Sequence, residues 1–207
     1  MTPWMAMFAA CAASYLVGSL PTAYLAVRWL KRVDVRTVGS GNVGATNVTR
    51  AAGLGPGVVV FLIDLGNGLA AVLVVAPWLV APEILTPAVR LACGVSAVLG
   101  HAFPVFLRFQ GGKGVATTIG VLLGTMPLVA GVYLAVWGLG FACSRYVSVG
   151  SLAATVALPI AQLLTRQALP DVLLGVALAA LLIARHRANI VRLAQGTEHH
   201  GGRRKSS

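Results

Sequence analysis

Residues 114–143 read GVATTIGVLLGTMPLVAGVYLAVWGLGFAC, and the number of times this stretch crosses a membrane decides the topology of the chain. It contains no charged side chain and is longer than the roughly 20 residues that one transmembrane helix needs. Met126-Pro127 lies near its middle, and proline lacks an N–H and restricts the residue before it, so we expect a helix break there. The stretch therefore crosses either once or twice, and in the second case each half is only about 18–24 Å long at about 1.5 Å per residue.

The rest of the chain is equally apolar. Of its 207 residues, 57% are hydrophobic and 10% are charged, whereas soluble domains carry about 25% charged residues. The beginning, MTPWMAMF, has no basic residue before the first apolar run, so we expect a membrane anchor there and no cleaved signal peptide. We expect one integral membrane domain over 1–207, with 196–207 as a basic, flexible cytoplasmic tail. The further candidate spans are about 4–30, 54–81, 84–107, 147–165 and 170–185.

Charge sets the orientation. The chain has 16 Lys and Arg against 5 Asp and Glu, a net charge of +11. The basic residues lie between apolar blocks, which favours membrane lipids with anionic headgroups as partners and no nucleic acid. They are dense in the first and third connections and in the tail, so these regions should face the cytoplasm. A single pass of 114–143 would put the tail outside. Two passes put it inside, and we predict an all-α protein with seven transmembrane helices, N-terminus outside and C-terminus cytoplasmic.

Four polar segments share the cytoplasmic side of this topology. They are VGSGNVGATNVTR (38–50), GHAFPVFLRFQGGKGVATT (100–118), SRYVSVGS (144–151) and RHRANIVRLAQGTE (185–198). Glycines allow backbone N–H groups to converge, and Arg50 and Lys113 add fixed positive charge. Converging amides beside a cation are typical of a phosphate site. QGGKGVATT is not a P-loop, because the first glycine is missing and the lysine is followed by Gly114 instead of Ser or Thr.

The carboxyl-terminal segment has a spacing of its own. If a helix continues past Arg185, then His186, Asn189 and Arg192 lie on roughly one face. His186 and Asn189 could bind a hydroxyl or phosphate oxygen, although basic residues at a membrane exit also snorkel without any further function. The three cysteines lie singly, without metal-type spacing. This spacing predicts buried free thiols and no metal site at the cysteines, and we expect no cofactor.

Three of these segments, SGNVGATNVTR, GHAFPVFLRFQGGKGVATT and HRANIVRLAQGTE, closely resemble the signatures of the bacterial acyl-phosphate:glycerol-3-phosphate acyltransferases. The likeness covers essentially the whole chain. It implies a seven-helix enzyme of the bacterial cytoplasmic (inner) membrane with its active site facing the cytoplasm. It also implies glycerol 3-phosphate and fatty acyl phosphate as substrates, lysophosphatidic acid as product, and no metal.

The resemblance also implies site residues. Those in the first segment are Ser40, Gly41, Asn42, Thr46, Asn47 and Arg50. Those in the second are His101, Gly111, Gly112, Lys113 and Gly114, and those in the third are His186, Asn189 and Glu198, with Ser148 as a further polar contributor. Of these, the resemblance makes His186, Asn189, Lys113 and His101 catalytic. Relatives often carry Asp-x-x-Lys-Gly in the second span, but here the run is Asp64-Leu-Gly-Asn67-Gly68. An intramembrane carboxylate usually has a partner, and we expect Asp64 to be structural.

The implied reaction needs no acyl-enzyme, because acyl phosphate is already activated. Direct attack by the C1 hydroxyl would be catalysed by orientation and by donors aimed at the oxyanion. The proton acceptor is left open between His186, His101 and a donor phosphate oxygen. Two other classes compete on the residues alone. One is a transporter of a phosphorylated metabolite, against which no internal repeat is found, and the other is a structural membrane subunit.

Overall fold

The computed structural model describes residues 2–200, so Met1 and the basic run at 203–205 lie outside the described residues. All regular structure among the described residues is helical, which confirms the all-α prediction. The chain divides between Met126 and Pro127 into two compact units. The boundary coincides with the expected helix break: one helix ends at Thr125, Met126 has non-helical backbone angles, and the next helix begins at Pro127. That the whole chain acts as one domain stays a prediction.

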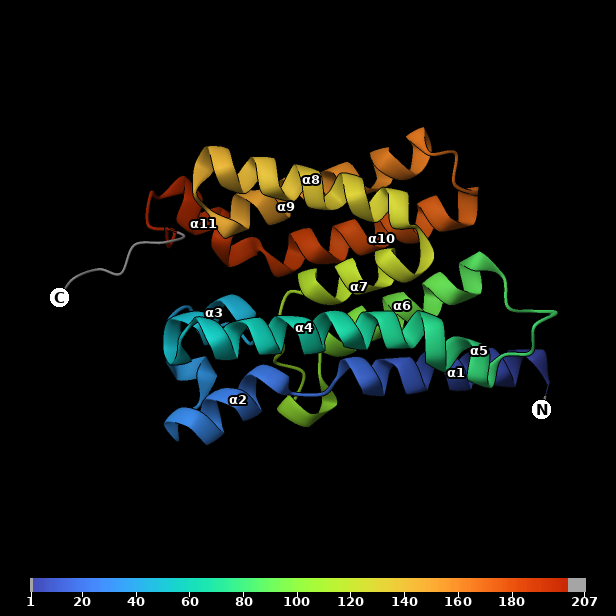
Figure 1. The fold of residues 1–207 in the computed structure, drawn as a ribbon, viewed down its shortest axis with the longest axis horizontal. Helices are drawn as coiled ribbons and strands as arrows, with labels where there is room; N and C mark the ends of the chain where they lie inside the picture. Colours follow the sequence, from blue (N-terminus) through green and yellow to red (C-terminus); the bar gives the residue numbers. More distant parts are fainter. Residues whose placement is uncertain (1, 201–207) are drawn as a thin grey trace. The chain divides into compact units, whose positions relative to one another are not determined.

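Unit 1 ends at Met126 and contains seven α-helices with three short non-α turns (Figure 1). In chain order these are α1 Pro3–Gly18, α2 Thr22–Lys31, η1 Val35–Thr37, α3 Ala45–Ala52, α4 Leu54–Ala70, the π-helix η2 Ala71–Val75, α5 Ala76–Leu79, α6 Pro87–Ala102, η3 Val105–Leu107 and α7 Val115–Thr125.

Glycines let the helices of unit 1 approach one another closely. Gly18 of α1 lies against the backbone of Ala97 in α6, and Gly100 of α6 lies against Tyr15 of α1. A side chain at either glycine would collide with the facing helix backbone. Gly68 and Gly120 bring α4 and α7 together in the same way. Small residues at helix contacts are typical of membrane proteins, where packing replaces the hydrophobic effect as the force between helices.

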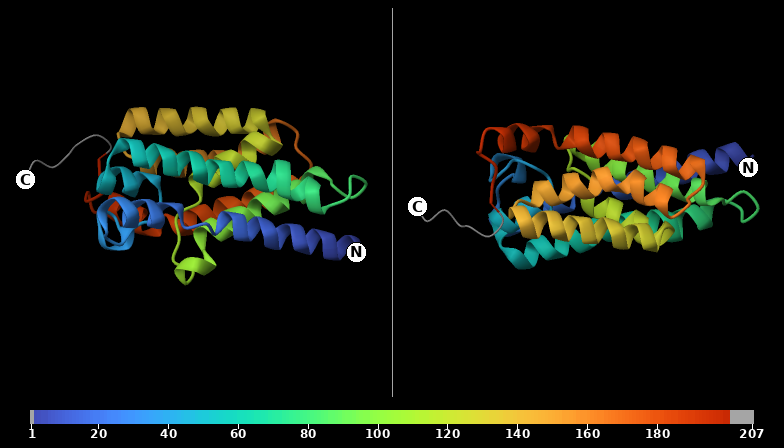
Figure 2. Two further views of the ribbon diagram at one scale, coloured as in Figure 1. Left: turned by 60° about the horizontal axis from the view of Figure 1, so that its bottom comes forward. Right: turned by 90° about the horizontal axis from the view of Figure 1, so that it is seen from above.

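Unit 2 begins at Pro127 and contains α8 Pro127–Ser144, α9 Val147–Leu164, α10 Leu169–Arg185 and α11 Arg187–Ala194. Helix α9 packs against both α8 and α10, and the three run side by side (Figure 2). Polar side chains join α8 to α9: Trp137 Nε1 donates to Ser151 Oγ at 3.2 Å, and the hydroxyls of Tyr133 and Thr155 are 3.5 Å apart. Tyr133 is 1% exposed and points into this unit.

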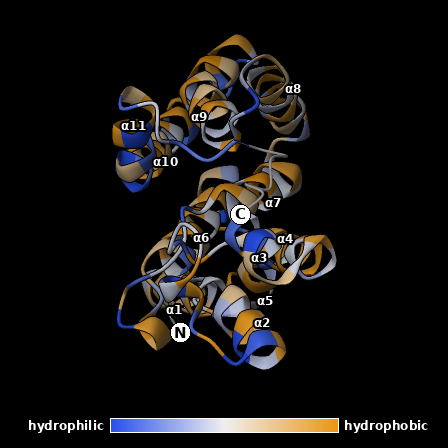
Figure 3. Ribbon diagram, turned by 90° about the vertical axis from the view of Figure 1, so that its left-hand side faces the viewer, coloured by the Kyte–Doolittle hydropathy of each residue, from blue (hydrophilic) through white to orange (hydrophobic). Residues whose placement is uncertain are grey.

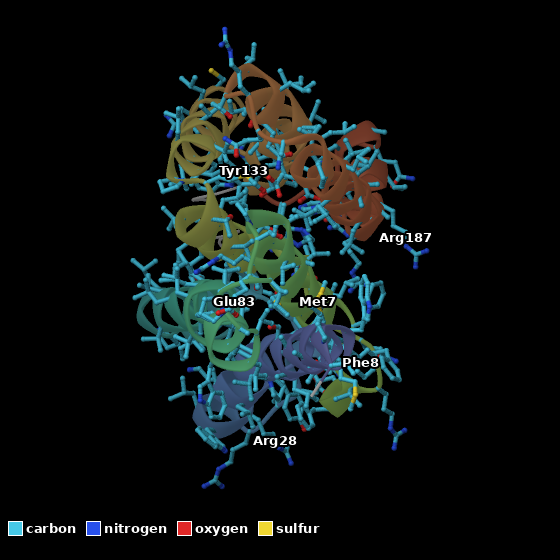
Figure 4. All side chains as sticks on the ribbon, turned by 90° about the vertical axis from the view of Figure 1, so that its right-hand side faces the viewer. Met7, Phe8, Arg28, Glu83, Tyr133 and Arg187 are labelled. Atoms are coloured by element: carbon cyan, nitrogen blue, oxygen red, sulfur yellow. The ribbon has the colours of Figure 1, made fainter. Side chains whose placement is uncertain are left out.

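Large apolar side chains cover the outside of many helices. Phe8 is 77% exposed and points away from the helices (Figure 4), and Trp4 and Trp78 are exposed to a similar extent. Among residues 2–200, five helical segments are long and apolar enough to cross a membrane: Pro3–Lys31, Leu54–Leu79, Pro87–Leu107, Pro127–Ser144 and Val147–Leu164. The bent pair α10 and α11 makes a sixth when it is counted as one span. These segments agree with the predicted ones to within a few residues.

The predicted count of seven spans depends on α7. This helix has 11 residues, so it is about 17 Å long against about 30 Å of hydrocarbon. It is too short to count as a span by length. The count of five to six is what the described helices support, and seven passes stay a prediction. The last predicted span, 170–185, matches α10. The helix does not continue straight past Arg185, which was the condition for His186, Asn189 and Arg192 to share one face: it breaks at His186, and α11 turns away by 55°.

Candidate active site

The loop between Val38 and Gly44 is held in shape by Asn47. The Asn47 side-chain Oδ1 accepts from the Ser40 N–H at 2.9 Å, and its Nδ2 donates to the carbonyls of Val35 and Val38, both at 3.0 Å. Gly39 has a φ of +60° and leaves no room for a side chain beside Asn47 Oδ1. Asn47 was predicted to bind phosphate. Its hydrogen bonds indicate that Asn47 shapes the loop that contains Ser40. Binding of phosphate by Asn47 itself stays a prediction.

This loop leads into the amino end of α3. Gly44 is the N-cap, and the predicted residue Thr46 lies in the first turn. N–H groups in a first helical turn lack partners within the helix and attract anions. Ser40, Gly41 and Asn42 precede this turn, and Arg50 lies one turn further along α3. Figure 3 shows hydrophilic residues on α3 beside the largely apolar α4.

An ion pair anchors the preceding turn. Arg36 Nη2 lies 2.6 Å from Asp34 Oδ2, and hydrogen bonding from Arg36 holds the pKa of the Asp34 carboxyl below its usual range. Arg36 Nη1 also donates to Gln110 Oε1 at 3.5 Å, which reaches the second predicted segment. Neither contact was predicted from the sequence, although Asp34-Val-Arg36 is a spacing that permits the ion pair.

The second segment folds back onto the end of α6. The N–H of Gly112 donates to the His101 carbonyl at 3.0 Å, and a side chain at Gly111 would collide with the carbonyls of His101 and Ala102. Gly114 has a φ of +86° and is the N-cap of α7. Lys113 therefore immediately precedes a helix amino end, the combination expected of an anion site.

The first and second segments meet within unit 1. A side chain at Gly112 would collide with both the His101 ring and the carbonyl of Val43 in the first loop. Two residues predicted as part of one site, Gly112 and His101, thus meet, and Val43 of the first loop lies against them, although the two loops are about 70 residues apart in sequence. The predicted convergence holds for these two segments.

Asp64 is a group whose role the sequence did not reveal. It is 1% exposed on α4. Its Oδ1 accepts from the Thr22 hydroxyl at 2.5 Å and lies 3.8 Å from His101 Nδ1. Thr22 was not predicted as a site residue. The available signal was the acid itself in an apolar span, which demands a partner, but the sequence does not say which one.

In unit 2 the third segment is organised by Glu198. This carboxylate accepts from Asn189 Nδ2 at 2.7 Å, from Arg192 Nε at 2.8 Å and from Ser148 Oγ at 3.0 Å. Burial raises the pKa of Glu198, but these three donors together outweigh it and leave the pKa below its usual value. A carboxylate that draws three donors to itself positions them, and it would repel a phosphate. The predicted residues Ser148, Asn189 and Glu198 are brought together, with Glu198 as the hub.

His186 lies at the bend between α10 and α11 and is 1% exposed. Its Nδ1 is 2.7 Å from the carbonyl oxygen of Leu182. A carbonyl only accepts, so Nδ1 carries a hydrogen and, in the neutral ring, Nε2 holds the lone pair. This is the form in which a histidine can take a proton at Nε2. Figure 3 shows hydrophilic residues along neighbouring α11.

Metal chemistry was not predicted. Across residues 2–200, no three or more His, Cys, Asp or Glu side chains are grouped so that they could hold a metal ion.

Known proteins that are similar to this chain identify its family. A family model described as glycerol-3-phosphate acyltransferase matches residues 8–196. The chain belongs to this family. The glycerol-3-phosphate acyltransferase of Gloeobacter violaceus is 46% identical over 195 residues, covering 94% of this chain and 95% of that protein. The enzyme of the same description from Myxococcus xanthus is 48% identical over 184 residues, covering 89% and 94%.

Solved structures agree. The crystal structure of PlsY (YgiH), an integral membrane glycerol 3-phosphate acyltransferase, in its glycerol 3-phosphate form, is 40% identical and covers 96% of each chain with a TM-score of 0.86. The lysophosphatidic acid form gives 39% identity, 95% coverage of each chain and a TM-score of 0.82. With its apolar helices, this likeness identifies the chain as a multi-pass integral membrane protein.

Proposed function

We propose that this protein transfers a fatty acyl group from acyl phosphate to the C1 hydroxyl of glycerol 3-phosphate, giving lysophosphatidic acid and inorganic phosphate. The observation that carries the proposal is the meeting of the first two segments at Val43 and Gly112 in a chain of the glycerol-3-phosphate acyltransferase family. Relatives solved with glycerol 3-phosphate and with lysophosphatidic acid supply the substrate and product. The donor is inferred from the resemblance of the sequence motifs.

The chemistry requires two phosphorylated molecules to lie close together. The C1 oxygen of glycerol 3-phosphate attacks the acyl carbonyl carbon, a new C–O ester bond forms, and the bond from the acyl carbon to the phosphate oxygen breaks. Phosphate leaves with the bonding electrons. Arg50 offers a planar bidentate donor and Lys113 a point charge, which together offset the repulsion between the two anions. Amides of the 38–44 and 110–114 turns supply further donors for phosphate and for the developing oxyanion.

Three groups could accept the hydroxyl proton in this proposal. They are Nε2 of His186, given that its Nδ1 faces the Leu182 carbonyl, the His101 ring, and an oxygen of the donor phosphate. Asn189, held by Glu198, orients the reacting groups. The His186→Ala variant tests the first of these acceptors. Loss of kcat by a factor of about 100 or more, within the range for general base catalysis, assigns the proton to His186, whereas near-normal kcat excludes His186.

We also propose the placement in the membrane: seven passes in the bacterial cytoplasmic membrane, with the N-terminus outside and both the C-terminus and the active site on the cytoplasmic side. The density of basic residues in the first and third connections supports it. In a variant without Cys11, Cys93 and Cys143, a membrane-impermeant maleimide should label Glu83→Cys in intact cells. It should label Gln195→Cys only after permeabilisation, and the reverse pattern would invert the topology.

The function itself is tested with purified protein in lipid vesicles. Glycerol 3-phosphate is supplied with acyl phosphate or with acyl-CoA, while lysophosphatidate and released phosphate are measured. Equal amounts of both products from acyl phosphate, and none from acyl-CoA, support the proposal. Movement of labelled glycerol 3-phosphate across the vesicle wall without any ester formed would instead identify a transporter.

A further inference from the structure

Asp64 is a buried carboxylate in the middle of a membrane-spanning helix. It lies on α4 within the span Leu54–Leu79 and is 1% exposed. An ionisable residue in this position is costly and is kept where it has a partner and a function. The acyl-transfer chemistry described above does not use it.

Two side chains from other helices converge on one oxygen of this carboxylate. The Thr22 hydroxyl of α2 donates to Oδ1 at 2.5 Å, and His101 Nδ1 of α6 lies 3.8 Å from the same oxygen. The second distance is within ion-pair range and longer than a hydrogen bond. Asp64 thus connects α2, α4 and α6 immediately below the point where α6 ends and the second segment begins.

The opposite edge of the His101 ring faces that segment. A side chain at Gly112 would collide with Nε2 of His101, so the glycine backbone is in direct contact with the ring. The same position is bounded by the Val43 carbonyl of the first loop. The backbone of His101 holds the turn as well, through the Gly112 N–H at 3.0 Å. His101 therefore lies between the buried carboxyl group of Asp64 and the two loops of the candidate phosphate site.

The residue one turn after Asp64 is not a lysine. Position 67, one turn after Asp64, is an asparagine whose Nδ2 is buried without a hydrogen-bond partner among the described residues. His101 is the basic side chain that lies at ion-pair distance from Asp64, 3.8 Å from its Oδ1.

We propose that Asp64 is a positioning residue: by holding the His101 ring, it fixes the 110–114 turn in the shape that binds a substrate phosphate. This inference rests on the proposed function, since it assigns the turn to phosphate binding. It predicts that the carboxyl group of Asp64 controls substrate affinity through His101, although Asp64 lies inside the bilayer-spanning part of α4 and does not touch substrate.

The test is a double-mutant cycle of Asp64→Asn and His101→Gln, with Asp171→Asn as the matched control. Asp171 is 3% exposed at the start of α10 and undergoes the same chemical change outside this cluster. Steady-state kinetics with both substrates should show KM for at least one of them raised about tenfold in Asp64→Asn, with kcat changed less than threefold. The KM of the double variant should be no higher than that of the more impaired single variant, because both substitutions act through the His101 ring. Asp171→Asn should keep KM within twofold.

A second readout does not depend on activity. Amide hydrogen exchange of residues 104–114 should accelerate at least tenfold in Asp64→Asn and in His101→Gln, but not in Asp171→Asn, while exchange in α1 and α6 stays unchanged. Faster exchange throughout unit 1 would mean a purely structural role. Adding Asn67→Lys to His101→Gln further separates a structural role from the positioning role. The new ammonium group should restore the Tm of His101→Gln, but it should leave the KM raised.

Failure of the proposed function and failure of the positioning role give different results. If the wild-type protein forms no lysophosphatidate, the proposed function fails, and exchange of the 104–114 segment still decides the positioning role. If the wild type is active and Asp64→Asn leaves both KM and local exchange unchanged, or if the effects of the two single variants add, the positioning role is wrong.

Discussion

Asn47→Ala is the substitution whose consequence can be worked out most fully from the structure. Asn47 makes three hydrogen bonds, one from the Ser40 N–H and two to the carbonyls of Val35 and Val38, and is almost fully buried. Each such bond contributes about 1 kcal/mol net, so the closed loop should lose about 3 kcal/mol. Because 1.4 kcal/mol is a factor of ten, the equilibrium constant for opening the loop should rise by about two orders of magnitude.

The assay is amide hydrogen exchange of residues 35–44 in detergent, together with KM for both substrates. Thr37→Ala is the control, since it removes a single hydrogen bond, from the Thr37 hydroxyl to the Asp34 carbonyl, in the same region. It should accelerate exchange by less than about tenfold. If residues 35–44 exchange no faster in Asn47→Ala than in Thr37→Ala, or if the loop opens without any change in KM, the reasoning is refuted. Asn47 would then not be the residue that holds a phosphate-binding loop in shape.

Two further variants test other parts of the site. Gly112→Ala forces a side chain onto the His101 ring and the Val43 carbonyl, so the turn must shift and KM should rise at least tenfold with the Tm lowered only slightly; Gly55→Ala, where a side chain meets open space, is the control and should change neither. Glu198→Gln keeps the shape of the hub but removes its charge. Since the pKa of Glu198 is lowered in the folded state, the charge stabilises the fold above the unfolded value of about 4.3 and this contribution is lost as pH falls through the lowered value. The Tm advantage of wild type over Glu198→Gln should therefore be full at pH 7 and shrink below about pH 4; an advantage independent of pH would contradict the role given to the charge.

Much of the fold could be predicted because its signals are local. Proline at 127 ends α7 at Thr125 and starts α8, as its chemistry requires. The long apolar runs gave the spans to within a few residues. By contrast, the bend at His186 has neither proline nor glycine beside it, so the sequence left open whether the helix continues past Arg185. That bend depends on tertiary packing, which a helical periodicity does not report.

The candidate site, like the fold, could be predicted from the sequence only in part. Glycines and cations could be assigned to loops from sequence because turn chemistry is local. The roles of particular side chains could not, since they depend on partners far away in the chain. Glu198 proved to be a hub for Ser148, 50 residues earlier, and Asp64 is paired with residues 42 positions before and 37 after it. A polar residue in an apolar span indicates that a partner is needed, but the partner can be identified only from the packing of the helices.

The central claim is that the glycine-bounded segments of unit 1 bind substrate phosphate. The most direct measurement is the steady-state KM of purified Lys113→Ala for glycerol 3-phosphate and for acyl phosphate, with Lys31→Ala as a control from the exposed end of α2. The account predicts that Lys113→Ala raises at least one KM by tenfold or more, or abolishes turnover, at an unchanged Tm, while Lys31→Ala matches wild type. Kinetics of Lys113→Ala equal to those of wild type for both substrates would contradict it.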